Sequence, residues 1–457
     1  MASMEIVAQY GVTVDGIEVR HSDSIASLKG LTEVLNQVRT EHVGVVLAQS
    51  DVKLSDMSLQ FMSDCLEEQS VSGVIADYIE ETGDGGRKLK LVAEPEKHVT
   101  RDTFDMGLIV ICRTEVAQTI ASTMVETEYG ALYGLWLGLQ RYGELFHTAV
   151  PSGFIVPKDL RESDKKQFDY VNPLYETYQK DLERVCTDHL YKIGASVSGK
   201  SSLTFETDEV FPCEATVVIP VKNRHTTIAD AIRSALTQKT DFTFNVIVVD
   251  NHSTDSTTEI VSGIADRDNK LIHIVPEAKD LGIGGCWNVA VSDSRCGKYV
   301  VQLDSDDLYA SDKTLQTMVN CLKKGKYAMA VGSYKLVDFS LNDLPPGVIS
   351  HKEWTDENGG NNLLRVNGLG APRAFATSWL RSNPLPNVSY GEDYAIGLRA
   401  TRCFKIGRIF TPIYLCRRWA GNSDSGISAE VEAAHNAYKD RIRSEEIAIR
   451  IKQNEKQ

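Results

Sequence analysis

The most regular pattern in the chain is an alternation of short apolar runs and amphipathic segments between residues 215 and 307. Runs rich in β-branched residues at 215–220, 244–250, 271–275 and 299–303 have the length and composition of strands buried on both faces. Between them, residues 228–236 and the stretch through Asn288 place apolar positions at helical spacing. This alternation predicts an α/β fold, with a mostly parallel, Rossmann-like sheet.

Polar and glycine residues follow these strands directly. Asp250 ends the second strand, a glycine-rich turn at 281–285 follows the third, and an acidic run at 304–307 follows the fourth. The carboxyl ends of parallel strands share one edge of a sheet, and open α/β sheets bind ligands at that edge. We therefore expect these residues to line one crevice, where Asp250 accepts hydrogen bonds from a base or a ribose.

The acidic run is the strongest single signal. On an extended chain Asp304 and Asp306 point to the same side, so we expect one to hold a ribose hydroxyl and the other to ligate a divalent cation. Carboxylates crowded at the tip of a buried strand are costly unless a cation balances them. A solvated surface turn is the alternative interpretation.

Two further groups extend this candidate site. Glu392 and Asp393 open a predicted helix, where acids also stabilise the helix dipole; if they face the crevice, the pair supplies a general base. Arg417 and Arg418 precede an aromatic residue and a glycine, a composition suited to diphosphate oxygens or a sugar face.

Taken in order, six motifs resemble the family 2 glycosyltransferases of the GT-A fold. They are residues 219–224, residues 248–255, Gly282 with Asn288, residues 303–307, residues 391–393, and Arg417 with Arg418. The resemblance covers about residues 212–428, and six ordered matches are far more specific than one.

The resemblance implies a role for each motif. It gives the nucleotide sugar to Pro220, Val221, Arg224, Asp250, Gly282, Asn288, Asp304, Ser305, Arg417 and Arg418. It assigns Mn²⁺ or Mg²⁺ to Asp306 with Asp304, and the role of general base to Asp393, beside Glu392. The implied reaction is inverting transfer from a nucleotide-diphosphate sugar, UDP-linked by family analogy, to a hydroxyl acceptor such as a glycan. Many relatives carry a histidine where this chain has Trp419, so the third metal ligand is open, with His225, His435, water and diphosphate as options.

The N-terminal half repeats parts of this pattern. Residues 24–77 follow residues 281–338 in outline, and Tyr129-Gly-Ala-Leu-Tyr133 parallels Tyr390-Gly-Glu-Asp-Tyr394. Ala131 and Leu132 replace the acid pair, so we predict a degenerate, non-catalytic GT-A-like copy that supports the active half or extends its acceptor surface. Two α/β units with merely generic patterning are the alternative.

These patterns divide the chain into four parts. We predict a non-catalytic domain at 1–156, a helical connector and linker at 157–211, the catalytic domain at 212–428 and a C-terminal helix at 429–457. The connector holds an amphipathic helix at 173–186 and a Gly/Ser-rich run at 194–202. The mixed charges of the C-terminal segment favour docking on the protein over membrane contact.

The amino-acid composition narrows the class of protein to which the chain belongs. At 457 residues with 42% hydrophobic and 25% charged residues the chain is globular, and a net charge of −14 argues against a nucleic-acid partner. Nine scattered cysteines without a CxxC pair favour a reduced, cytoplasmic setting, and we expect neither a signal peptide nor a transmembrane segment. A homo-oligomer stays possible.

Two other functions remain open. A sugar-phosphate nucleotidylyltransferase shares the sheet type but calls for a glycine-rich basic loop after the first strand, and Val221-Lys-Asn-Arg224 contains no glycine. A non-catalytic nucleotide-sugar or glycan-binding scaffold belongs to a different class, against which the retained Asp304, Asp306 and Asp393 argue.

Overall fold

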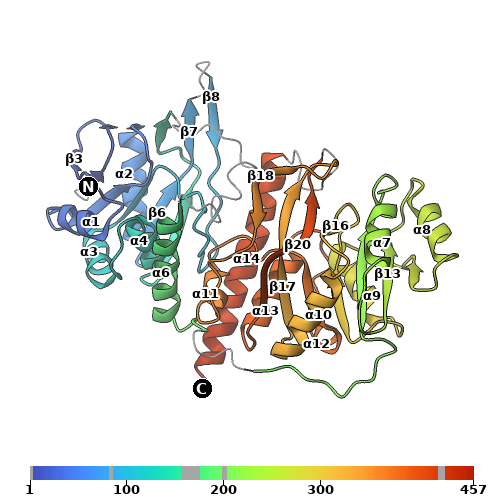
Figure 1. Cartoon of the computed structure of the whole chain (residues 1–457). Coiled ribbons are helices and arrows are strands. Elements are labelled where there is room, and N and C mark those ends of the chain that lie inside the picture. Colours follow the sequence, from blue (N-terminus) through green and yellow to red (C-terminus); the bar gives the residue numbers. More distant parts are fainter. Residues whose placement is uncertain are drawn as a thin grey trace. The chain divides into compact units, whose positions relative to one another are not determined.

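The computed structural model of the chain (Figure 1) describes residues 4–81, 86–156, 175–197, 203–419, 422 and 428–456. The chain divides into two compact units. Unit 1 comprises Met1–Ser196, Leu364–Val366 and Asp440–Gln457, and unit 2 comprises Val197–Leu363 and Asn367–Lys439. Among the described residues no helix is long and apolar enough to cross a membrane. All nine cysteines are free.

Unit 1 contains two sheets. The six-stranded sheet has the order β10-β6-β9-β4-β1-β3, formed by β1 (Met4–Ala8), β3 (Glu18–His21), β4 (His42–Val46), β6 (Val71–Ala76), β9 (Ile109–Arg113) and β10 (Glu144–Thr148). The five-stranded sheet has the order β2-β5-β11-β7-β8, formed by β2 (Val12–Thr13), β5 (Val52–Leu54), β7 (Tyr78–Glu81), β8 (Arg87–Lys90) and β11 (Gly153–Ile155).

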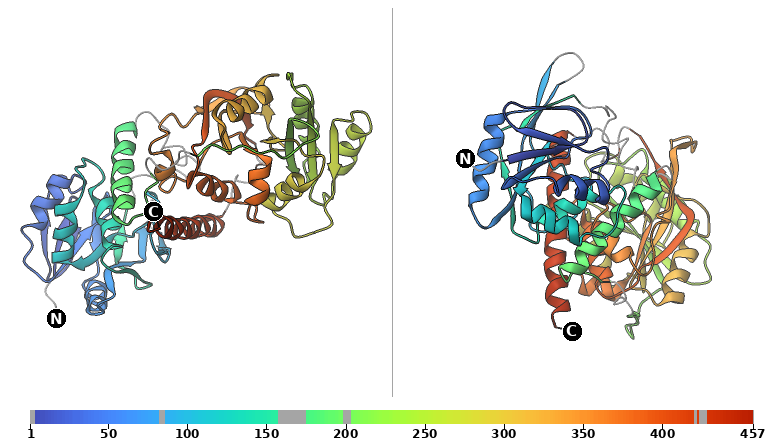
Figure 2. Two further views of the ribbon diagram at one scale, coloured as in Figure 1. Left: turned by 90° about the horizontal axis from the view of Figure 1, so that it is seen from below. Right: turned by 90° about the vertical axis from the view of Figure 1, so that its left-hand side faces the viewer.

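Helices complete unit 1. They are α1 (Leu28–Leu35), α2 (Asp56–Asp64), the short 3-10 helix η1 (Cys65–Glu67), α3 (Thr114–Thr123), α4 (Ala131–Leu139) and α6 (Glu176–Lys192). The long helix α14 (Ala429–Asn454), dark red in Figures 1 and 2, contributes its residues from Asp440 onward. There Asp440 accepts hydrogen bonds from buried Arg101, and Arg443 donates to the Leu364 carbonyl. These contacts within unit 1 are those expected if the C-terminal segment docks as a helix on the protein.

Unit 2 is built on one nine-stranded sheet with the order β14-β13-β12-β15-β19-β17-β20-β16, to which β18 adds by pairing with β17. Its strands are β12 (Ala215–Val221), β13 (Phe244–Asp250), β14 (Leu271–Ile274), β15 (Tyr299–Gln302), β16 (Leu308–Tyr309), β17 (Met329–Val337), β18 (Asp343–Ile349), β19 (Arg373–Ala376) and β20 (Gly407–Arg417). Strands β14, β13, β12 and β15 are parallel, as the alternating pattern predicts.

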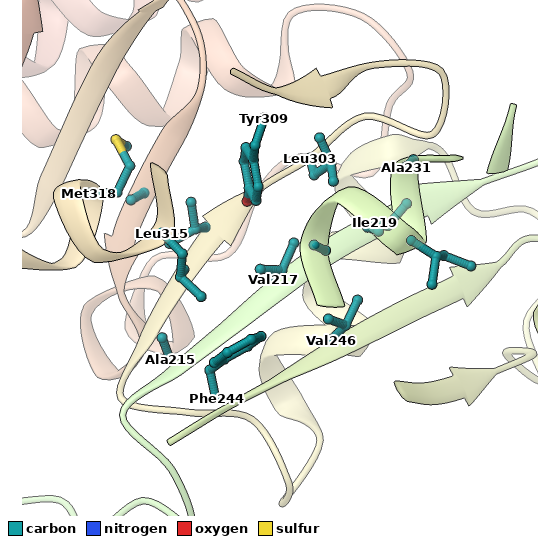
Figure 3. Close-up of a cluster of buried hydrophobic side chains, with 14 of the residues drawn as sticks. Ala215, Val217, Ile219, Ala231, Phe244, Val246, Leu303, Tyr309, Leu315 and Met318 are labelled. Atoms are coloured by element: carbon teal, nitrogen blue, oxygen red, sulfur yellow. The ribbon is translucent and has the colours of Figure 1, made fainter. Parts of the chain in front are cut away.

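The helices of unit 2 cover both faces of this sheet. They are α7 (Ile228–Leu236), α8 (Thr257–Ala265), α9 (Ile283–Ser292), α10 (Thr314–Gly325), α11 (Gly359–Asn362), α12 (Thr377–Ser382) and α13 (Glu392–Thr401), together with α14 up to Lys439. Figure 3 shows the core on one face, where Val217, Ile219 and Val246 of the sheet meet Ala231 of α7 and Leu315 and Met318 of α10. Burial of such side chains is the main stabilising contribution, at about 1.5–3 kcal/mol for each large one.

The two units repeat one strand topology. Unit 1 contains the order β10-β6-β9-β4-β1 and unit 2 the order β20-β17-β19-β15-β12. The pairing directions also agree: β9 and β19 are each antiparallel to both neighbours, and the outer pairs are parallel. A helix follows each central strand at once, and the next helix follows Gly130 or Gly391. An internal duplication would produce this match, and the duplication itself stays a prediction.

Some predicted boundaries differ from the structure. Strand β15 ends at Gln302, and residues 305–306 form a turn, so the prediction that Asp304 and Asp306 share one side of an extended chain is wrong. The division into units assigns α6 to unit 1 and residues 440–457 to the same unit, while the predicted connector is not a unit of its own. Residues 157–174 of that connector and 198–202 of the predicted linker lie outside the described residues.

Candidate active site

The carboxyl ends of β12 and β13 form one wall of the site. Val221 lies opposite Asp250 in the parallel register, and the Asn251 amide donates to the Val221 carbonyl at 2.8 Å. Arg224, in the loop after β12, donates from its backbone to the Thr257 hydroxyl at 2.8 Å. Pro220, Val221 and Arg224 therefore lie at the carboxyl edge of the sheet, and their contact with a nucleotide stays a prediction.

Asp250 is wholly buried and bonded to its own surroundings. Its carboxylate accepts from the Ser253 amide at 3.0 Å and the Thr258 hydroxyl at 2.5 Å, and His273 Nε2 lies 3.6 Å away. Burial alone would raise the pKa of Asp250, but the nearby His273 and the hydrogen bonds from Ser253 and Thr258 outweigh it and lower the pKa. This carboxylate organises the loop, and its contact with a nucleotide stays a prediction.

Asn251 is a residue that motif matching missed. Its side-chain amide donates to the Leu281 carbonyl at 2.7 Å, which fixes the amide orientation, and its buried Oδ1 has no hydrogen-bond partner among the described residues. An unpaired buried acceptor is costly, so a position like this at a ligand edge suits a donor group of a bound molecule. Only its place after β13 could have indicated this role.

The glycine turn and Asn288 position the acid pair. Gly282 precedes α9, and a Cβ on it would lie 2.4 Å from the Val388 backbone. The side-chain amide of Asn288 donates to the Leu385 carbonyl at 2.8 Å and accepts from the Leu385 backbone amide at 3.0 Å. Helix α9 therefore anchors the segment that leads into α13, and a direct contact of Gly282 or Asn288 with the nucleotide stays a prediction.

The acidic turn after β15 concentrates three carboxylates. Asp304 accepts from the Gln302 side-chain amide at 2.8 and 3.0 Å, and Asp307 accepts from the Arg417 backbone amide at 2.8 Å. Burial, and then the charges of Asp304 and Asp306, raise the pKa of Asp307 well above its ordinary value. Burial also raises the pKa of Asp304, although Arg373 and Gln302 oppose it. Ser305 is buried within this turn.

Trp419 contacts this acidic turn through its indole nitrogen. Nε1 of Trp419 and Nδ2 of Asn422 each lie 3.2 Å from Asp306 Oδ2, and the Arg224 guanidinium lies 3.8 Å from the same oxygen. Arg224 also lies 6.0 Å from the centre of the Trp419 ring. Trp419 cannot ligate a metal, but it orients the carboxylate that the sequence assigns to the metal.

The paired arginines have different surroundings. Arg417 is buried, donates to the Asp306 carbonyl through Nε and lies 4.8 Å from the Phe339 ring centre, while its Nη2 has no partner among the described residues. Arg418 is half-buried at the end of β20 and donates from its backbone to the Val337 carbonyl. Arg417 thus stabilises the acidic turn through its contact with the Asp306 carbonyl. Diphosphate binding by either arginine stays a prediction.

The acid pair opens α13, as its spacing predicts. Asp393 forms a 2.6 Å ion pair with Arg373, and burial would raise the pKa of Asp393, but Arg373 and Lys439 lower it. Glu392 is buried with no partner for Oε2 among the described residues. Burial, reinforced by the charge of Asp393, raises the pKa of Glu392 to about 8. The two neighbouring carboxyls therefore differ in protonation near neutral pH.

A hydrogen-bonded chain joins the acidic turn to the acid pair. The side chain of Gln302 donates to Asp304 and accepts from the Arg373 backbone amide at 3.0 Å, and Arg373 pairs with Asp393. Arg373 ends the stretch 368–373, whose glycines indicate flexibility and in which no motif marks a functional residue. The structure therefore brings both predicted carboxylate groups into one neighbourhood, and Arg373 is the missed residue that connects them.

The donor set suits a divalent cation bound together with a ligand. Within the described ranges no group of three or more His, Cys, Asp or Glu side chains is placed to hold a metal alone. His225 is engaged with Asp255 at 2.8 Å, and His435 stacks on Tyr390. Mg²⁺-type ions commonly take one or two carboxylates and complete their shell with phosphates and water. The crowded carboxylates of the turn fit such an ion.

Together, the α/β sheet, the acids at its strand ends and the second acid pair are the features expected of a nucleotide-dependent group-transfer domain. Residues 216–376 match the sequence model described as Glycosyl transferase family 2. This segment is therefore a family 2 glycosyltransferase domain, and the resemblance predicted from the ordered motifs is confirmed.

The relatives agree with this match but extend beyond this chain. An uncharacterized glycosyltransferase of Rickettsia felis is 27% identical over 43% of this chain and 31% of its own length. The succinoglycan biosynthesis protein ExoO of Rhizobium meliloti is 33% identical over 29% of this chain and 36% of its own length. The chain thus spans about a third of these relatives.

Among solved structures, S. aureus TarS 1-349 in complex with UDP-GlcNAc is similar to 51% of this chain and covers 71% of its own length, with 24% identity and a TM-score of 0.40.

Proposed function

We propose that unit 2 is an inverting, metal-dependent glycosyltransferase that moves a sugar from a nucleotide-diphosphate sugar to a hydroxyl acceptor. The observation that supports this proposal is the hydrogen-bonded chain Asp304–Gln302–Arg373–Asp393, which joins the carboxylate proposed for the donor side to the one proposed for the acceptor side. The family match of residues 216–376 supports the donor class. The TarS complex with UDP-GlcNAc motivates testing UDP-sugars first.

The residues divide the chemistry between them. Asp306, held by Trp419 and Asn422, and Asp304 would hold Mn²⁺ or Mg²⁺, which when bound offsets negative charge on the leaving diphosphate. Asp393 takes the proton of the acceptor hydroxyl as general base. Its ion pair with Arg373 keeps the carboxylate ionised at neutral pH.

Glu392 complements Asp393 as its protonated neighbour. With a pKa of about 8 its carboxyl keeps its proton at neutral pH, and its unpartnered Oε2 is free to contact a substrate hydroxyl. One carboxyl then acts as base and the other as hydrogen-bond donor, which avoids two adjacent negative charges in a buried site.

The N-terminal unit is proposed as a degenerate copy without catalysis. It repeats five strands of the unit 2 sheet, yet Ala131 and Leu132 occupy the start of the helix that follows Gly130, where unit 2 has its acid pair. No candidate base remains at that helix start.

A donor panel tests the proposal. Release of nucleoside diphosphate and transfer to hydroxylated acceptors are measured for UDP- and GDP-sugars with Mn²⁺, Mg²⁺ or EDTA. We expect activity that EDTA abolishes, that falls at least about 100-fold in Asp306→Ala and that falls similarly for transfer in Asp393→Asn. Asp241→Asn, an exposed change at the start of the loop into β13, is the matched control.

The outcomes separate the candidate functions. Binding of nucleotide sugar without turnover under any condition would leave the non-catalytic scaffold. Formation of a nucleotide sugar from a sugar phosphate and a nucleoside triphosphate would instead favour the nucleotidylyltransferase.

A further inference from the structure

The first turns of α14 cover the turn from which the acid pair begins. Gly391 has φ of 80°, and a Cβ on it would meet the Tyr438 ring at 3.2 Å and Lys439 Cγ at 3.6 Å. Tyr390 stacks on His435 with ring centres 3.8 Å apart and planes 8° apart. The turn 390–391 and these residues of α14 therefore pack as one element.

Lys439 is the charged group of this contact. Its side chain is 7% exposed, and Nζ donates to the Asn367 carbonyl at 2.8 Å. The same ammonium lies 4.4 Å from the centre of the Tyr390 ring and 5.3 Å from that of Tyr394, the residues that bracket the acid pair. A buried ammonium needs compensation by negative charge or by aromatic faces. The nearby Asp393 and these two rings provide both.

Unit 1 offers an internal comparison at the matching turn. Gly130 precedes α4 there, and a Cβ on it would meet Val185 and Leu182 of α6 at 3.0 and 3.5 Å. Helix α6 also carries Asp181, whose Oδ2 accepts from the Thr127 hydroxyl and from the Glu128 and Tyr129 amides, at 3.0, 2.7 and 3.0 Å.

The two turns thus carry opposite charge arrangements. In unit 1 the covering helix supplies a carboxylate that accepts from the backbone amides of Glu128 and Tyr129, and in unit 2 the covering helix supplies an ammonium beside the turn that leads into the acid pair. Packing alone calls for a helix over the glycine in both units. Packing does not require a lysine at this position. The positive charge of Lys439 therefore complements the negative charge of the acid pair.

Charged groups from other elements also face Asp393. Arg373 of β19 forms its ion pair, Glu392 of α13 is its sequence neighbour, and Asp304 after β15 acts through Arg373 and Glu392. Arg373 is thus shared between Asp393 and Asp304. Lys439 is the second cation that lowers the pKa of Asp393.

We propose that Lys439 is a positioning residue of the transfer reaction, which braces the Tyr390–Tyr394 turn and supplies the second positive charge facing the Asp393 carboxylate. This inference rests on the proposed function of Asp393 as base. Lys439 makes no contact with the reacting atoms in this proposal and acts through Asp393. The C-terminal helix is then part of the acceptor side of the site.

The test separates charge from packing with matched variants. Lys439→Gln can still donate to the Asn367 carbonyl but has no charge, and Lys439→Arg keeps the charge. Lys452→Gln, an exposed change near the end of the same helix, is the control. Transfer kcat and KM are measured from pH 3.5 to 8 with the active donor, and thermal unfolding reports whether each variant folds at each pH.

We expect Lys439→Gln to move the acidic limb of the kcat profile up by about one pH unit. Because the pKa of Asp393 in the wild type lies below 3.8, transfer then falls several-fold near pH 4 and is unchanged at pH 7, with the donor KM unchanged. Lys439→Arg restores the profile. If Lys439→Gln folds poorly, Lys439→Arg and Tyr390→Leu are compared instead. Tyr390→Leu removes the ring beneath the ammonium, and we expect it to shift the acidic limb in the same direction by a smaller amount.

Two results would overturn this inference. One is an unmoved acidic limb in Lys439→Gln with kcat lowered equally at all pH values, which a purely structural brace would give. The other is a profile that Lys439→Arg does not restore. Failure of the proposed function looks different: wild type is inactive with every donor, or Asp393→Asn keeps full transfer.

Discussion

Replacement of Glu392 by glutamine tests the electrostatics of the acid pair without relying on a substrate. Burial and the Asp393 charge raise the pKa of Glu392 from 4.5 to about 8. Each pH unit between these values corresponds to about 1.4 kcal/mol of unfolding free energy. The carboxyl therefore lowers stability by up to about 5 kcal/mol between pH 4.5 and pH 8.

The sign follows from proton binding. The folded protein holds the Glu392 proton up to about pH 8, while the unfolded chain releases it near pH 4.5. The contribution of Glu392 to stability is therefore most favourable below pH 4.5 and is lost as pH rises toward 8. Glutamine resembles the protonated carboxyl in shape and cannot ionise, so Glu392→Gln should lose this dependence.

Urea unfolding followed by tryptophan fluorescence measures the difference, since Trp287, Trp354, Trp379 and Trp419 report on unit 2. With EDTA present, we expect wild type and Glu392→Gln to agree within about 1 kcal/mol at pH 5. At pH 8 the variant should be several kcal/mol more stable, and Asp241→Asn should follow wild type throughout. A difference between wild type and Glu392→Gln that stays constant from pH 5 to 9 would refute the assignment of a protonated Glu392.

Three further predictions concern neighbouring residues. Arg373→Met removes the first cation at Asp393, so the pKa of the base rises and transfer at pH 6 falls about 10- to 100-fold, with a larger shift of the acidic limb than in Lys439→Gln; an unchanged pH profile would contradict this. Gly284→Ala places a Cβ 1.9 Å from the Pro386 carbonyl and should cost about 1–3 kcal/mol, measured by thermal unfolding, whereas Gly263→Ala, whose Cβ meets only Arg267 at 3.9 Å, should be neutral or stabilising. Trp419→Phe removes the indole donor to Asp306 and should raise the Mn²⁺ concentration for half-maximal activity about tenfold; an unchanged Mn²⁺ dependence would show that Trp419 does not orient this carboxylate.

The catalytic half of the fold follows closely from local pattern. The predicted runs at 215–220 and 244–250 correspond to β12 and β13, and the acid pair opens α13 as its spacing indicates. These strands and this helix start can be predicted from the sequence because a strand buried on both faces is a continuous apolar run and because acidic residues are favoured at helix starts. The turn at 305–306 escaped prediction because alternation cannot distinguish the end of a strand from a tight turn.

The sequence by itself determined the strand and helix order from β12 to β15, the family of residues 216–376 and the candidate acids, since these depend on local periodicity and on motif order. Only the tertiary structure decided which charges meet. Gln302 is close to Asp304 in sequence, but Arg373 lies 20 residues before Asp393 and Lys439 lies on a different helix, and no spacing rule links these two cations to the acid pair. Their effect on the acid pair depends on burial and on distances of a few ångströms, which pairing of the strands and packing of α14 set.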